Sequence, residues 1–202
     1  MKHTPLATLT ICGLDELDYR SVQGVTHVLS ILDPGWPEPA AFRAIGPHLR
    51  TTLRFHDAIE RAPHVVLPQR RHIKAILAFG GNLGGDPGHL LIHCHAGISR
   101  STAAMAMILA QAFAQESEEA IVDRQLLIRP QAWPNSRMVH IADELLGREG
   151  RLSASLGRIY AQRLSAQPEL AETMRGLNRA KEVELGLQGK AANERMCDNS
   201  QD

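Results

Sequence analysis

Cysteine, aromatic residues and net charge are all scarce in this sequence. Its 202 residues include only three cysteines (Cys12, Cys94 and Cys197), and the formal net charge is +0. Three thiols this far apart do not make a disulfide framework, so we expect a reducing, cytoplasmic compartment. Because positive and negative charges balance, the sequence lacks the excess of basic residues that is typical of proteins that bind nucleic acid or acidic membranes. We therefore expect no nucleic acid and no membrane among the partners.

Long apolar runs and a nucleotide-binding motif are also missing. No segment approaches the length of a membrane-spanning helix, and the N-terminal stretch "MKHTPLATLTICGLDELD" lacks the apolar region and cleavage site of a signal peptide. The glycine-rich run Gly80–Gly88 lacks Gly-Lys-Ser/Thr and follows a helical pattern rather than a strand, so we interpret it as a turn. The sequence leaves the oligomeric state open.

Strand and helix patterns alternate up to about residue 150. Apolar strand patterns cover Leu6–Leu14, Val25–Asp33, Thr51–His56 and His89–Cys94. Helical patterns run from Pro68 to about Phe79, and over Ser101–Ala114, Ser117–Leu127 and Ser136–Leu146. This alternation predicts an α/β fold of three layers, with a central, mostly parallel sheet flanked by helices. We assign residues 1–150 to this domain and residues 151–202 to a C-terminal helical extension whose polar tail frays from about Arg175.

The stretch "HCHAGISRS", His93 to Ser101, gathers residues that could bind a metal ion or act as a nucleophile. His89, His93, Cys94 and His95 are all of ligand type for zinc. Alternate residues of a strand face opposite ways, so Cys94 should point away from both His93 and His95. We therefore expect no metal and no cofactor here, and interpret His93 either as a residue that orders the loop from behind or as a packed strand histidine.

The same stretch also fits a strand, a tight loop and a helix. Ligands of parallel sheets bind beyond the carboxyl ends of the strands, where Cys94 should lie. A helix start offers unpaired N–H groups to an anion, Gly97 permits a positive φ in the loop, and Arg100 can bind two phosphate oxygens. These features also stabilise a thiolate, so Cys94 is a candidate nucleophile that would form a phosphocysteine. The hydroxyl of Ser101 is placed to stabilise the departing sulfur.

The loop composition bears on the substrate. Between Cys94 and Arg100 the loop has no lysine and no second arginine that could bind the additional phosphates of an inositol phosphate. We therefore expect a phosphoprotein monoester as the substrate, with phosphotyrosine favoured, or a small aryl phosphate. Two tryptophans on loops, Trp36 and Trp133, are candidates for the rim of the pocket. The residues expected to contact the phosphate are His95, Ala96, Gly97, Ile98 and Ser99.

At these residues the sequence resembles the cysteine-dependent protein tyrosine phosphatases, whose signature is H-C-x5-R-[ST]. "HCHAGISRSTA" is most similar to the dual-specificity branch, where A-G-x-S-R-S recurs, and to small bacterial tyrosine-phosphatase-like proteins. The resemblance covers about residues 5–150. It implies an α/β fold, with Cys94 as the nucleophile, Arg100 as the phosphate binder and Ser101 as the assisting hydroxyl. "RPQAWPN" resembles the family's R-P-x-x-x-P-N segment, which implies that Asn135 braces the phosphate loop.

Ester cleavage by this route needs an acid that protonates the leaving oxygen. Such a residue must follow a strand at the same sheet edge as Cys94, which leaves Asp57 and Asp33 as candidates. In the family that the sequence resembles, a loop aspartate upstream of the cysteine has this role, and we favour Asp57.

Two other functions stay open. The chain could be a phosphate-binding module of the same fold without turnover. It could also be a sulfurtransferase or an arsenate reductase, which use a similar cysteine loop. Those chemistries usually need a second cysteine, and Cys12 is the candidate.

Overall fold

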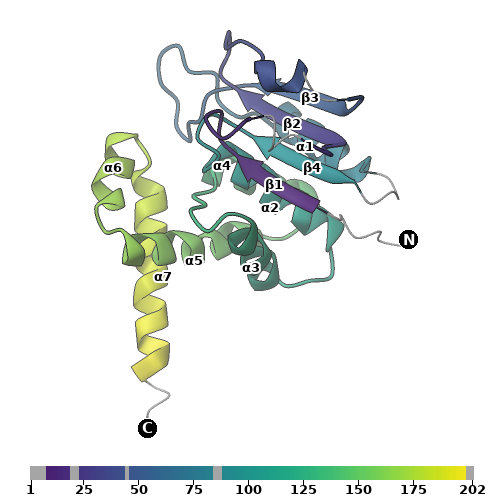
Figure 1. Cartoon of the computed structure of the whole chain (residues 1–202). Coiled ribbons are helices and arrows are strands. Elements are labelled where there is room, and N and C mark those ends of the chain that lie inside the picture. The colour runs from purple at the N-terminus through teal and green to yellow at the C-terminus, as the bar shows by residue number, and fades with distance from the viewer. Residues whose placement is uncertain (1–7, 19–22, 44–45, 84–87, 199–202) are drawn as a thin grey trace.

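Four parallel strands form the centre of the structure, a computed structural model that describes residues 8–18, 23–43, 46–83 and 88–198 (Figure 1). The strands are β1 (Thr8–Cys12), β2 (His27–Leu32), β3 (Leu49–Arg54) and β4 (His89–His93), in the spatial order β1-β4-β2-β3. Each matches a predicted strand, although residues 6 and 7 of the first lie outside the described part. Because the strands are parallel, the residues after β2, β3 and β4 reach one edge of the sheet.

The predicted helices of the first 150 residues are present. They are α1 (Arg70–Gly81), α2 (Arg100–Ala112), α3 (Glu118–Ile128) and α4 (Ser136–Leu146), together with a short 3₁₀ helix, η1 (Ala40–Arg43). The largest difference in a helix start is at α1, which begins at Arg70 after the cap residue Gln69, so Pro68 is not its first residue. The glycine-rich turn after α1 lies partly outside the described residues, at 84–87.

The sheet has a core on each face, which confirms the predicted α/β sandwich. Helices α1, α2 and α4 lie on one face of the sheet (Figure 1). Leu29, Ile31, Leu90 and Ile92 face these helices, whose buried side chains complete the larger core. Val28 and Leu91 face the other way and pack with Phe42 of η1. Since α2 is buried from Arg100 to Ala110, it is the central helix of the larger core. Its N-terminus is therefore held rigidly at the end of β4.

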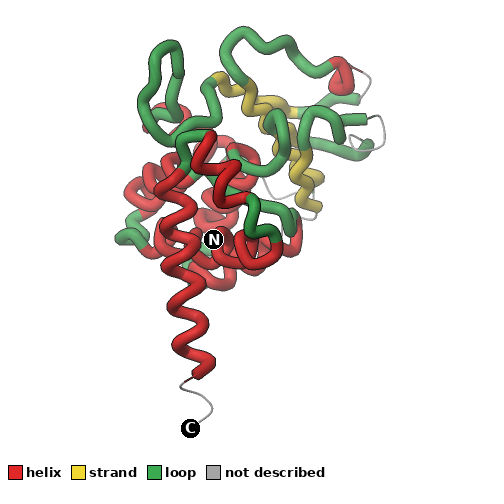
Figure 2. Tube along the Cα trace, turned by 90° about the vertical axis from the view of Figure 1, so that its left-hand side faces the viewer, coloured by secondary structure: helices red, strands yellow, loops and turns green. Residues whose placement is uncertain are grey.

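The last fifty residues form three more helices, α5 (Arg151–Ala166), α6 (Leu170–Gly176) and α7 (Ala180–Asp198). Helix α7 crosses α5 at close range, since a Cβ on Gly186 would lie 2.7 Å from Cβ of Tyr160 (Figure 1). The expectation of a frayed tail from Arg175 is therefore wrong for the start of α7, where Glu182 and Val183 are buried, as is Arg179 just before it. Figure 2 shows that only the C-terminal part of α7 extends away from the other elements. The division of the chain at residue 150 stays a prediction.

Within the described residues, none of the helices combines the length and the apolar character that crossing a lipid bilayer requires.

Candidate active site

Cys94 follows β4 directly and lies beside the first residues of α2. Its Sγ is 3.2 Å from Oγ of Ser101, and both side chains are buried. The segment from Cys94 to Arg100, hereafter the phosphate loop, therefore turns the chain from the sheet edge into the start of a central helix. The first N–H groups of a helix have no partner within it, and its positive dipole end favours an anion. This arrangement can hold a phosphate next to a sulfur nucleophile.

Glycine is required at the middle of the phosphate loop. Gly97 has a φ of +67°, as predicted, and a Cβ there would lie 2.4 Å from the backbone carbon of Cys12 and the backbone nitrogen of Gly13. The loop is thus pressed against the end of β1. In addition, Nε of Arg129 donates to the carbonyl oxygen of Gly97 at 3.0 Å, and Nη1 and Nη2 of Arg129 donate to the carboxylate of Glu16.

Arg100 is buried, and its guanidinium is paired with groups of the protein. Its Nη1 lies 2.5 Å from Oδ1 of Asp33 and donates to the carbonyl oxygen of Phe55 at 2.6 Å. The carboxylate of Asp33 is 35% exposed, at the surface end of this pair. A phosphate entering the loop would therefore compete with Asp33 for the same guanidinium.

Asp57 also lies at this edge, on the other side of the phosphate loop. Its Oδ1 accepts hydrogen bonds at 2.8 Å from Oγ of Ser99 and from Nδ2 of Asn135. Asn135 caps α4 with its own Oδ1, and its backbone N–H donates to the carbonyl oxygen of Ser99. Asn135 therefore links Ser99 of the loop to Asp57. The bracing of the loop by Asn135, which the R-P-x-x-x-P-N resemblance implied, stays a prediction. None of these bonds involves Oδ2 of Asp57.

The two tryptophans have different environments. Trp36 is 45% exposed, and its ring lies 4.5 Å from the ring of His95 in the phosphate loop. It therefore lies at the rim, as predicted. Trp133 is buried, and its Nε1 donates to Glu182 at 2.6 Å. The prediction that Trp133 lines the rim is wrong, because its ring packs against Tyr160 in the interior.

The histidines beside Cys94 do not face it together. His93 points to the opposite face of the sheet, where its Nε2 bonds Oγ of Ser30 at 2.7 Å. His95 accepts the backbone N–H of Asp33 at Nε2. Across the described residues, no three His, Cys, Asp or Glu side chains are grouped in a way that could hold a metal ion.

Acid should destabilise the protein through His93, because burial lowers the pKa of this histidine from 6.5 to about 4. Between these two pH values the unfolded chain takes up a proton that the folded chain excludes. We expect the free energy of unfolding to fall by about 3 kcal/mol as the pH drops through this window, and urea unfolding at several pH values measures it. His93→Gln should lose this dependence, whereas His140→Gln, at an exposed histidine, should keep it. Equal slopes in both variants would contradict the assignment.

Known proteins share this fold and part of the sequence. No family model matches the chain. Rat "Dual specificity protein phosphatase 12" is 27% identical over 165 residues, which are 80% of this chain and 45% of that protein. The chain thus spans less than half the length of this relative. Human tyrosine phosphatase-like serine/threonine/tyrosine-interacting protein superposes with a TM-score of 0.55 at 19% identity, over 73% of this chain and 95% of its own. Human DUSP28 superposes with a TM-score of 0.53 at 17% identity, over 70% of this chain and 96% of its own.

The chain thus has the fold of these tyrosine-phosphatase-like structures. Its sequence is similar to that of a dual-specificity protein phosphatase, as the A-G-x-S-R-S loop predicted. The two superposed structures leave more than a quarter of this chain unmatched, since they cover 73% and 70% of it.

One buried residue close to the phosphate loop was not predicted from the sequence. Arg179, between α6 and α7, donates from Nη2 to Oγ of Ser99 at 2.8 Å. Its guanidinium also lies 3.5 Å from Oδ1 of Asp57. The tail around it is polar and charged, which is typical of a solvated segment. No sequence signal separates Arg179 from its exposed neighbours, so only the fold could reveal it.

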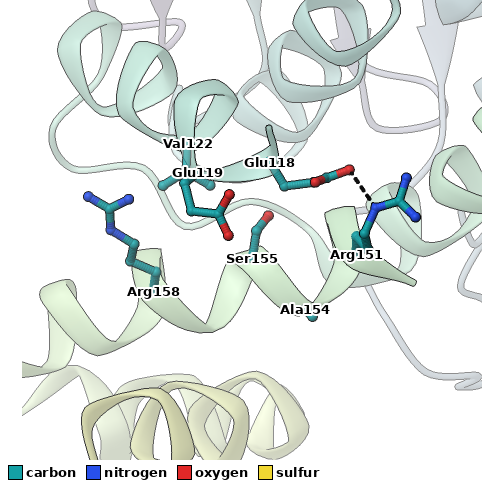
Figure 3. Close-up of a pocket in the computed structure, with 7 residues that line it drawn as sticks. All are labelled: Glu118, Glu119, Val122, Arg151, Ala154, Ser155 and Arg158. Atoms are coloured by element: carbon teal, nitrogen blue, oxygen red, sulfur yellow. Dashed lines mark hydrogen bonds and ion pairs between the residues drawn. The ribbon is translucent and has the colours of Figure 1, made fainter. Parts of the chain in front are cut away.

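A second hollow lies between α3 and α5, away from the phosphate loop (Figure 3). No residue that contacts Cys94, Arg100 or Asp57 lines it. Both arginines of this hollow are already paired, Arg151 with Glu118 and Arg158 with Asp123. The candidate active site of this chain is therefore the edge of the sheet at Cys94.

Proposed function

We propose that this chain is a phosphoprotein monoester phosphatase, with phosphotyrosine as the favoured substrate, that acts through a phosphocysteine at Cys94. The observation that carries the proposal is the position of Cys94 Sγ, 3.2 Å from Ser101 Oγ at the start of α2, in one loop with Arg100. A nucleophile, an anion-binding helix start and a bidentate cation are thus combined within eight residues.

In the first step, the thiolate of Cys94 attacks phosphorus and the bond from phosphorus to the ester oxygen breaks. The leaving oxygen takes a proton from Asp57, whose Oδ2 is not used by Ser99 or Asn135. Arg100 holds two phosphate oxygens after exchanging Asp33 for the substrate. The loop residues His95, Ala96, Gly97, Ile98 and Ser99 surround the phosphate.

In the second step, Asp57 removes a proton from water, the water oxygen attacks phosphorus, and the sulfur–phosphorus bond breaks. The hydroxyl of Ser101 donates to the departing sulfur and so stabilises the thiolate. Inorganic phosphate leaves and the enzyme returns to its starting state. No cofactor takes part.

The substrate class rests on the rim of the site. Trp36 and His95 offer an aromatic surface beside the loop, which suits an aryl phosphate such as phosphotyrosine. The named relative is a dual-specificity protein phosphatase, which also supports a phosphoprotein substrate. The scarcity of cysteine supports a reducing, cytoplasmic location.

The environment of Cys12 argues against arsenate reduction and sulfur transfer. Burial raises the pKa of Cys12 to about 12, so this thiol stays protonated at neutral pH. A protonated thiol is a poor resolving nucleophile.

Turnover of an aryl phosphate tests the proposal. The purified chain with p-nitrophenyl phosphate and excess chelator should release p-nitrophenol, and acid quenching should trap one phosphoryl group per chain, detected as added mass on Cys94. Phosphate binding without turnover would instead identify a binding module. Activity that is lost on chelation would contradict the metal-free route.

A further inference from the structure

We propose that Arg179 of the C-terminal segment is a positioning residue for Asp57 in the phosphatase reaction. The inference rests on the proposed function and extends the site to the C-terminal segment, beyond residues 5–150, where the sequence motifs of the resemblance lie. The buried guanidinium of Arg179 contacts both the phosphate loop and Asp57, the candidate acid.

The contacts of Arg179 converge on one carboxylate oxygen. Nη2 of Arg179 donates to Oγ of Ser99 at 2.8 Å, and the same Oγ donates to Oδ1 of Asp57 at 2.8 Å. Nη2 also lies 3.5 Å from Oδ1 itself. Together with Asn135, these groups engage Oδ1 and leave Oδ2 to serve the leaving oxygen. A carboxylate held by one oxygen in this way has a fixed orientation, which proton transfer in a transition state requires.

Arg179 is in turn held by a second buried charge. Its Nε lies 2.9 Å from Oε2 of Glu182, whose side chain is 0% exposed. The same carboxylate accepts hydrogen bonds from Nε1 of Trp133 at 2.6 Å and from the backbone N–H of Ser136 at 2.8 Å. Helix α7 is thereby fastened to the segment that carries Asn135. Arg179 and Asn135 thus approach Asp57 from one connected unit.

Packing alone does not account for Arg179. Val183 and the close approach of Gly186 to α5 already fix α7 on the domain. A buried arginine and glutamate are expensive to desolvate, and apolar residues of similar size often stabilise a fold as well or better. The guanidinium of Arg179 instead contacts two groups of the candidate site, Ser99 and Asp57. That placement favours a role in the reaction over a role in stability.

The experiment measures kcat/KM for aryl phosphates whose leaving groups differ in basicity. An acid matters most for a basic leaving group such as phenolate and least for 2,4-dinitrophenolate, which departs without a proton. We expect Arg179→Gln to lower kcat/KM for phenyl phosphate about 20-fold, and for 2,4-dinitrophenyl phosphate less than about threefold. The exposed neighbour Arg175→Gln is the matched control and should change neither value.

Two further variants separate positioning from folding. In an Asp57→Asn background, Arg179→Gln should cause no further loss, because both changes remove the same proton transfer. Arg179→Lys keeps the charge without the planar fork and should recover part of the phenyl phosphate activity. If Arg179→Gln unfolds the chain, kcat/KM for the two aryl phosphates is compared in Arg179→Lys instead.

The outcomes distinguish this inference from the proposed function. An equal loss on all leaving groups, or an additive loss in the Asp57→Asn background, would overturn the positioning role while leaving the phosphatase intact. A wild-type chain without Cys94-dependent turnover would refute the proposed function itself.

Discussion

Replacement of Cys94 by serine should abolish aryl phosphate hydrolysis, with kcat/KM lower by more than about 10⁴-fold. A serine hydroxyl keeps its proton at neutral pH, and no described side chain next to Cys94 is placed as a base that would remove it. The substitution exchanges one buried atom and should leave the fold and phosphate binding intact. Initial rates with p-nitrophenyl phosphate, together with phosphate binding by calorimetry, measure the two properties separately.

Cys12 provides the matched control for this experiment. It is also buried and lies on β1 next to β4, where its backbone pairs in register with His93. Its side chain packs in the smaller core, beneath η1. Cys12→Ser should therefore keep kcat/KM within about threefold of the wild type, at some cost in stability. Turnover that survives Cys94→Ser, or disappears in Cys12→Ser, would show that the nucleophile has been assigned to the wrong thiol.

The two aspartates at the sheet edge should respond to substitution in opposite ways. Asp57→Asn removes the proton donor and should lower kcat/KM for phenyl phosphate by about 10²- to 10³-fold. Asp33→Asn removes a carboxylate that competes with phosphate for Arg100, so KM should fall and kcat should change little. Each variant is the control for the other, since both exchange one oxygen for a nitrogen at the same edge. Steady-state kinetics at neutral pH measures both values.

The reverse result would reassign the acid. If Asp33→Asn loses turnover and Asp57→Asn keeps it, the pair of Asp33 and Arg100 carries the proton transfer, and Asp57 only braces the loop through Ser99 and Asn135.

The phosphate loop was predictable because its parts are contiguous in the chain. A buried strand, a cysteine, a loop with glycine and an arginine that starts an apolar helix follow one another within a few residues, and backbone geometry fixes their relation. The closeness of Asp33 and Asp57 to Cys94 was also predictable, since residues that follow parallel strands share one sheet edge. The positive φ of Gly97 followed from the same local reasoning.

Side-chain partners across the fold were not predictable. The pairing of Arg100 with Asp33 rather than Asp57 depends on the strand order, in which β4 and β3 both flank β2. The burial of Trp133 depends on Glu182, which is 49 residues further along the chain. Nothing in the residues next to Trp133 or Glu182 along the chain indicates that these two side chains bond to each other.

The sequence by itself determined the fold class, the candidate nucleophile and the anion-binding start of α2, because each depends on short-range patterns of polarity and backbone freedom. Only the tertiary structure decided that Arg179 of the C-terminal segment contacts the phosphate loop. Arg179 reaches Ser99 across 80 residues. Helix packing, which sums many weak contacts over the whole chain, sets that distance, and no local motif encodes it.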